Sequence, residues 1–199
     1  ALHRGGRSTE SGPSLHPPTN DPTAGATSLR VLLRRETSQA HAQLDAHISQ
    51  LDLREPGPRA VYSRLLYRAT LRVGRACQWR AAEATPLMAR MIEALGPDFP
   101  ADNPPQQDAP LEADAAAYVM LGSQMGLTLL RQGLAPAQRT GALALAPDTA
   151  AWGAFVGRIG RCVPGTEAAE RLVADSCRVF GIFHDEALAL VTPAAERIP

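Results

Sequence analysis

The stretch SLRVLLRRETSQAHAQLDAHISQL, residues 28–51, decides the fold class. Its apolar residues recur at steps of three and four, which is the spacing of one face of an α-helix and not the alternation of a strand. Ser28 stands directly before the pattern and suits the N-cap of a helix. The pattern predicts one amphipathic helix of about six turns. Its apolar face would consist of Leu29, Leu32, Leu33, Ala40, Leu44, Ile48 and Leu51.

Helical periodicity continues on the C-terminal side of this stretch. The segment REPGPR, residues 54–59, is expected to end the first helix, and a second helix is predicted over about 60–84. Thr85 followed by proline predicts a third helix that reaches Leu95. The proline-rich segment 96–110 predicts a loop. Further helices are expected over about 111–131, 148–162 and 166–191.

These segments predict one all-α domain of six or seven helices over residues 28–191. No run of β-branched or aromatic residues alternates at a period of two, so we expect no strand. Residues 1–27 are rich in Gly, Pro, Ser and Thr and predict a flexible N-terminal tail. Residues 192–199 are expected to form a short C-terminal tail.

Composition narrows the classes of function. The chain has 199 residues, 45% of them hydrophobic, which is enough for one core. Twenty acidic residues balance twenty basic ones, so no net field favours nucleic acid or an anionic membrane as a partner. All the basic residues are Arg, which excludes Schiff-base chemistry on lysine. There is no signal-like apolar segment and no stretch of the roughly 18 apolar residues that a membrane helix needs, so we expect a soluble, cytoplasmic protein.

Among the histidines, His41 is the strongest candidate for a ligand. Two of the five histidines lie in the N-terminal tail. On the first predicted helix, Arg34, Thr37, His41 and Asp45 fall on one strip, because steps of three and four return to the same face. A helical histidine beside a core is more often a packing residue than a ligand, so position alone leaves both interpretations open. His47 lies six residues later, is turned away from this strip, and is interpreted as a surface or packing residue.

A second candidate feature is AYVMLGSQMGLTLL, residues 117–130. Gly122 and Gly126 fall on one side of the predicted helix, with Tyr118 one turn earlier. Each glycine inside a helix lowers its stability by about 0.5–1 kcal/mol relative to alanine. A pair of glycines on one face therefore indicates a structural or functional requirement for the missing side chains. Close approach of another helix is one reason, and a flat ligand lying against the backbone is the other. Ser123 would then offer a hydroxyl near the same surface.

Taken in chain order, these segments resemble bacterial heme oxygenases, particularly those associated with bacteriophytochromes. LRRETSQAHAQLDAHI, residues 33–48, is similar to the helix that carries the proximal histidine of that family. YVMLGSQMGLTLL, residues 118–130, resembles its kinked distal helix, whose glycines lie over the heme face. WGAFVGRI at 152–159 and CRVFGIFHDEAL at 177–188 resemble its final helices, so the similarity covers roughly residues 28–191.

The resemblance implies a heme oxygenase-like helical bundle and a specific reaction. Heme, as both substrate and cofactor, would be cleaved to biliverdin, carbon monoxide and ferrous iron with O2 and external electrons. The electron donor would be a ferredoxin, a flavodoxin or an NADPH-dependent reductase, since the chain carries no nucleotide or flavin fingerprint. A bacteriophytochrome is a candidate acceptor of biliverdin.

The resemblance also assigns roles to residues. His41 matches the proximal iron ligand. Gly122, Ser123 and Gly126 match the catalytic distal segment, and Tyr118 is expected beside the heme. Arg34, and less directly Arg158, would pair with heme propionates. The chain departs from the family at Leu121, where an acidic residue is usual, and at Leu127, where a further glycine is usual.

Three other interpretations stay open. A non-catalytic heme-binding or heme-sensing protein would keep His41 and lose turnover through Leu121 and Leu127. A di-iron oxidase of the same fold would need carboxylates and histidines converging from facing helices, for which residues 184–186 with Asp45 are the candidates, although no Glu-x-x-His pair exists. A thiaminase-like enzyme would need a cysteine nucleophile. The cysteines lack an identifiable base and are expected to be small buried residues, namely Cys77, Cys162 and Cys177.

Overall fold

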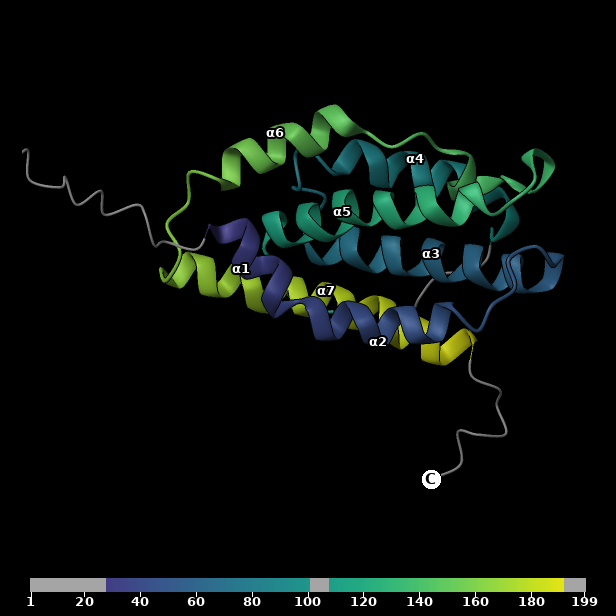
Figure 1. Ribbon diagram of the computed structural model, residues 1–199, viewed down its shortest axis with the longest axis horizontal. Coiled ribbons are helices and arrows are strands. Elements are labelled where there is room, and N and C mark those ends of the chain that lie inside the picture. The colour runs from purple at the N-terminus through teal and green to yellow at the C-terminus, as the bar shows by residue number, and fades with distance from the viewer. Residues whose placement is uncertain (1–27, 101–107, 192–199) are drawn as a thin grey trace, which may run out of the picture.

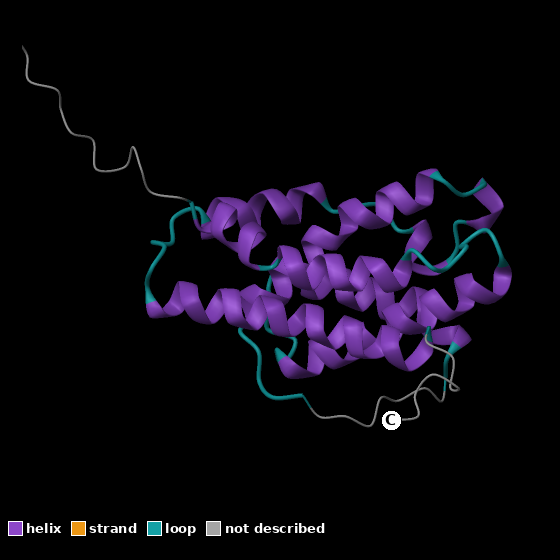
Figure 2. Cartoon of the chain, turned by 60° about the horizontal axis from the view of Figure 1, so that its bottom comes forward, coloured by secondary structure: helices purple, strands orange, loops and turns teal. Residues whose placement is uncertain are grey.

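The structure, a computed structural model, describes residues 28–100 and 108–191. In these residues the chain is all helical, with seven α-helices and no strand, as Figure 2 shows. The predicted all-α class and helix number are therefore confirmed. The two predicted tails, residues 1–27 and 192–199, lie outside the described residues.

The long C-terminal helix is the element around which the others are assembled. The helices are α1 (Leu29–Glu36), α2 (Ser38–Ile48), α3 (Pro56–Ala76), α4 (Thr85–Leu95), α5 (Ala113–Gln132), α6 (Thr149–Ile159) and α7 (Glu167–Leu190). Helices α1, α2, α3 and α5 all pack on α7, while α4 packs on α3 and α6 packs on α5. Figure 1 shows α2 beside α7 along one edge of the bundle and α6 along the opposite edge.

The first predicted helix is broken, which corrects the expectation of one continuous helix over 28–51. Helix α1 ends at Glu36 and α2 begins at Ser38, with Thr37 between them. The Thr37 hydroxyl donates a hydrogen bond to the Leu33 carbonyl at 2.7 Å. Such a bond from a side chain to the carbonyl four residues earlier competes with the backbone ladder and bends a helix. The α1–α2 junction at Thr37 is therefore a built-in bend.

The second helix also differs from the prediction, because it begins and ends earlier. Pro56 and Pro58 lie in its first turn, where a proline needs no backbone N–H, and do not act as breakers. The helix ends at Ala76, after which Gln78 and Trp79 adopt left-handed φ values of 54° and 56°. The other boundaries fall within a few residues of the predictions.

Capping side chains fix two of the predicted helix starts. The Asp148 carboxylate accepts a hydrogen bond from the Ala151 N–H at 2.9 Å and begins α6. The Thr166 hydroxyl accepts from the Ala169 N–H at 3.3 Å and begins α7. Both satisfy backbone donors that a helix leaves unpaired at its N-terminus.

A buried ion cluster joins α3 to α7. The Arg72 side chain is 2% exposed and donates to Glu186 at 3.0 Å and to Asp108 at 2.6 Å. Arg68 donates to the other Glu186 oxygen at 2.6 Å. Buried charges are tolerated only when paired in this way. The cluster fixes how α7 sits on α3, and α7 in turn supports α2 and α5.

None of the described helices combines the length and apolar character that crossing a membrane requires.

Candidate functional site

Helices α2 and α5 meet at one end and make little direct contact beyond it. Both pack on α7, which lies between them as a shared support. At the α1–α2 junction the Thr37 hydroxyl oxygen lies 3.5 Å from the Tyr118 hydroxyl oxygen of α5. Thr37 is 3% exposed, so this contact is part of the packed interior. It fixes α2 and α5 relative to each other at their N-terminal ends.

From this contact the two helices run in the same general direction, as the chain colours of Figure 1 show. His41 is four residues after Thr37 in α2, and Gly122 is four residues after Tyr118 in α5. Four residues are about one turn of an α-helix, or about 6 Å. His41 and Gly122 are therefore each about one turn beyond the Thr37–Tyr118 contact, on separate helices.

The His41 side chain is oriented and partly open to solvent. Its Nδ1 lies 2.8 Å from Asp45 Oδ2, one turn later on α2, and its side chain is 55% exposed. Its ring meets the Phe180 ring of α7 edge-on, with centroids 5.4 Å apart. A carboxylate beside Nδ1 favours a proton on that nitrogen, which would leave Nε2 as the metal-binding atom, as in many metal-ligating histidines.

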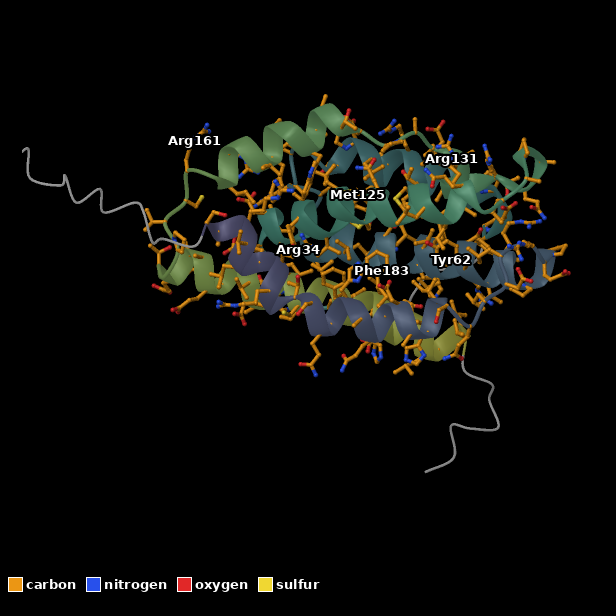
Figure 3. All side chains as sticks on the ribbon, viewed as in Figure 1. Arg34, Tyr62, Met125, Arg131, Arg161 and Phe183 are labelled. Atoms are coloured by element: carbon orange, nitrogen blue, oxygen red, sulfur yellow. The ribbon has the colours of Figure 1, made fainter. Side chains whose placement is uncertain are left out.

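Helix α5 presents an apolar strip to the surface of the bundle. We define the α5 strip as the residues at helical spacing from Tyr118, namely Tyr118, Gly122, Met125, Gly126 and Leu129. Met125 and Leu129 are 69% and 68% exposed, although large apolar side chains are usually buried in a globular protein. A Cβ added at Gly126 would meet no atom within 4 Å. The strip is therefore apolar and open, and Met125 is marked on α5 in Figure 3.

Trp152 of α6 covers the beginning of the α5 strip. Its ring lies 6.4 Å from the Tyr118 ring and 5.9 Å from the Phe155 ring. A Cβ at Gly122 would lie 3.8 Å from it, which is ordinary contact. The Arg30 guanidinium of α1 lies over its other side at 5.9 Å. Gly122 is thus half-covered and Gly126 is fully open.

The two arginines predicted to bind propionates have different surroundings. Arg34 on α1 is exposed and forms no ion pair within the described residues, and Figure 3 marks it on the side of α1 nearer α5. Arg158 is fully engaged: it donates to both oxygens of Glu83 at 2.9 Å and to Asp114 at 2.7 Å. The hydrogen bonds that Arg158 donates to Glu83 and then to Asp114 raise its pKa above the usual value. Arg158 therefore joins α6 to α5 and is not free to bind an anionic ligand.

Three other predicted positions lie off the α5 strip. The Ser123 hydroxyl donates to the carbonyl of Met120 at 2.9 Å, and adjacent helical residues point about 100° apart. Leu121 is 1% exposed and belongs to the core. Leu127 lines a small cavity on another side of α5, together with Leu87, Met91, Gln124, Ala142, Leu145, Ala146 and Pro147. Neither leucine stands between His41 and the glycines.

Sequence reasoning missed the two exposed residues Met125 and Leu129. Their distance from Tyr118, seven and eleven residues, was a usable signal because both spacings return to the same helix face. Trp152 is half-buried beside the strip. Its position depends on how α6 crosses α5, which helical spacing within one segment does not encode.

The described residues contain no group of three or more His, Cys, Asp and Glu side chains able to hold a metal ion. Glu186, proposed for a di-iron site, is paired with Arg68 and Arg72, and Asp185 lies 3.5 Å from Arg72. These side chains serve the buried ion cluster. The structure therefore offers nothing that favours the di-iron interpretation.

The three cysteines are free and differ in burial. Cys77 is buried, Cys162 is exposed and Cys177 is intermediate, so the expectation of buried residues is correct for Cys77 alone. Burial, followed by the charge of Glu36, raises the pKa of the Cys177 thiol. A raised pKa is the opposite of what a cysteine nucleophile needs.

The arrangement suits a flat, largely apolar molecule. It offers one imidazole nitrogen from α2, a glycine-lined apolar face from α5, and an unpaired guanidinium at the α1 end. Such a set can hold a Lewis-acidic centre, a planar apolar body and an anionic group at once. No protein-family model, no curated protein and no solved structure shows a significant match to this chain.

Proposed function

We propose that this protein is a heme oxygenase that binds heme between α2 and α5 and cleaves it to biliverdin, carbon monoxide and ferrous iron. The observation that carries the proposal is that His41 and Gly122 each lie about one turn beyond the Thr37–Tyr118 contact, on two helices that run in the same general direction. An imidazole on one helix and a bare backbone on the facing helix are what a five-coordinate heme with an open sixth position needs.

The residues present fit a heme in three respects. The Asp45 carboxylate fixes the His41 tautomer, so that Nε2 is the atom offered to iron. Met125 and Leu129 expose apolar side chains that a porphyrin would cover. Gly126 has no neighbour within 4 Å of a Cβ position, so a planar ligand can approach the α5 backbone there.

Each residue then has a defined part in the reaction. Bound heme supplies the iron that activates O2 and the meso carbon that is oxidised, with electrons from a separate protein. His41 would hold the iron. Gly122 and Gly126 would leave the α5 backbone free of side chains beside the ring, and Arg34 would bind a propionate carboxylate. Tyr118 is the polar side chain of the α5 strip and can pass a proton or orient a water molecule.

The same geometry favours turnover over binding alone. Leu121 and Leu127 were the sequence features that pointed to a non-catalytic heme binder. Both lie off the α5 strip, one in the core and one toward α4. Neither side chain therefore crowds the space where O2 would bind.

Titration of hemin into the purified protein tests the binding step. We expect a Soret band that saturates at one equivalent, and its loss or strong blue shift in His41→Ala. Gly126→Leu should weaken hemin binding because the added side chain occupies the proposed heme face. Gly157→Leu is the matched control, since Gly157 also lies in a helix with no neighbour within 4 Å of a Cβ, but on α6. Equal hemin affinity in both glycine variants would contradict the proposed location.

A second measurement tests the reaction itself. Under a reductase system in air, the Soret band should decay while the broad red absorption of biliverdin and released carbon monoxide increase. A Soret band that forms and then persists would reassign the protein as a heme-binding or heme-sensing protein. Absence of any Soret band would reject both the heme oxygenase and the heme-binding function.

A further inference from the structure

A second pair of histidines lies on the α2–α7 interface, about two turns beyond His41. His47 of α2 and His184 of α7 face each other with ring centroids 5.0 Å apart and planes inclined by 63°. Both side chains are partly exposed, so the pair is accessible from solvent. The sequence brings these two residues together only through the packing of α2 on α7, since they are far apart along the chain.

The positions one helical turn before and after each histidine carry no charge. One turn before His47 on α2 lie Gln43 and Leu44. One turn after it, just past the end of α2, lie Gln50 and Leu51. Those around His184 on α7 are Phe180, Gly181, Ala187 and Leu188. Neither imidazole therefore has a carboxylate one turn away on its own helix, unlike His41 with Asp45.

The spacing of the two rings matches that of two imidazoles on one metal ion. A tetrahedral ion holding two imidazole nitrogens at about 2.0–2.1 Å places the ring centroids about 5 Å apart. The measured centroid distance is 5.0 Å, and the inclined planes leave both rings free to turn a nitrogen toward a shared point. Little movement of α2 or α7 is needed to bring both ligands into place.

From this geometry we infer that His47 and His184 form a binding site for a borderline divalent transition metal, with Zn²⁺, Ni²⁺ and Cu²⁺ as the ions it takes. Imidazole nitrogen is a preferred ligand for these ions, and affinity increases from Ni²⁺ to Cu²⁺. Two protein ligands leave the remaining coordination positions to water. The site is therefore an open one, distinct in position and ligands from the heme site.

A metal ion bound at this site would link α2, which carries His41, to α7, on which α2 packs. A metal ion that binds only the folded protein increases its stability by mass action, so the melting temperature should rise with metal concentration. The inference does not depend on heme, and it is testable in the heme-free protein.

The test is calorimetric titration of Zn²⁺ into heme-free full-length protein in which His3 and His16 are replaced by alanine. That background removes the two histidines of residues 1–27, and the His41→Ala control below removes the third imidazole that lies outside the site. We expect one bound Zn²⁺ per chain and a rise in melting temperature on saturation. His47→Ala and His184→Ala should each weaken Zn²⁺ binding about tenfold or more, as loss of one of two ligands requires. Circular dichroism of each variant without metal checks that it is folded.

His41→Ala in the same background is the matched control, since it removes a histidine of α2 that lies outside the proposed site. It should leave the Zn²⁺ affinity unchanged. In the background without His3, His16 and His41, Cu²⁺ should give an electron paramagnetic resonance spectrum with coupling to two imidazole nitrogens. Absence of Zn²⁺ binding, or binding that survives both His47→Ala and His184→Ala in folded protein, would overturn the inference.

Discussion

At the residue scale, Asp45 is the side chain whose role the structure defines most sharply. It accepts the Nδ1 hydrogen of His41 at 2.8 Å, and both side chains are more than half exposed. An ion pair or hydrogen bond so exposed contributes about 0–1 kcal/mol to stability. The value of Asp45 must therefore lie in orienting His41 and not in holding the fold.

Replacement of Asp45 by alanine separates these two roles. Asp45→Ala should change the melting temperature of the heme-free protein little, because an exposed pair is lost. Its affinity for hemin should fall about tenfold to a hundredfold, which is the usual cost of removing the group that orients a metal ligand. Soret titration measures the affinity. Asp52→Ala, an exposed carboxylate just beyond α2, is the control, and equal affinities in the two variants would contradict the role of Asp45.

At the element scale, helical periodicity predicted which segments are helices but not where each one bends or stops. Thr85–Leu95 has the predicted boundaries because the proline in its first turn is a local signal. The bend at Thr37 was missed because the apolar period continues across it, and the side-chain bond that causes it leaves no mark on that period. The predicted site likewise combines features that the local sequence indicates with features that depend on distant segments. The local pattern indicated His41 and the glycine pair, whereas the partners of Arg158 come from segments far away in the chain.

The end of α3 depends on one glycine, which gives a prediction at this scale. The Trp79 ring lies over Gly74, where a Cβ would collide with three of its ring atoms, and the Trp79 N–H donates to the Gly74 carbonyl at 2.8 Å. Gly74→Ala should displace the ring and lower the free energy of unfolding by about 1–3 kcal/mol, the usual cost of overpacking. Denaturant unfolding measures the loss, and tryptophan fluorescence should shift to the red.

Gly57→Ala is the matched control for this change within the same helix. Gly57 lies in the first turn of α3, and a Cβ there meets nothing within 4 Å. This variant should lose less stability than Gly74→Ala, since its Cβ is crowded only by the ring of the next residue, Pro58, and alanine is the better helix former. Equal destabilisation by both substitutions would show that glycine flexibility, and not the Trp79 contact, is what α3 requires.

At the scale of the whole molecule, ion pairs between distant segments hold the helices in register. Arg72 joins α3 to α7, and Arg158 joins α6 both to Glu83, in the connection between α3 and α4, and to Asp114 of α5. The Glu83 side chain is 17% exposed and Arg158 is 38% exposed. The hydrogen bonds from Arg158 hold the pKa of Glu83 below its usual value. Stability should therefore depend on the ionisation of carboxylates such as this one.

The direction of that dependence follows from the lowered pKa of Glu83. Because the folded state binds its proton less readily than the unfolded state, the pair stabilises the protein fully above the unfolded pKa of about 4.5. This contribution is lost as the pH falls from there through the folded pKa. Glu83→Gln should thus lower the free energy of unfolding at pH 7 by about 1–2 kcal/mol. Between pH 5 and 3 the free energy of unfolding of this variant should fall less steeply than that of the parent, by the contribution of about one titrating group. Melting temperatures across this range give both quantities.

Glu93→Gln makes the same chemical change at an exposed carboxylate of α4 that forms no ion pair within the described residues. Its stability profile should follow that of the parent at every pH, because the substitution removes no ion pair among the described residues. If Glu83→Gln and Glu93→Gln give the same profile, the Arg158 pair does not hold α6 in place. The cover that Trp152 provides over Gly122 would then rest on the aromatic contacts of α6 alone, since Trp152 reaches the α5 strip from the same helix as Arg158.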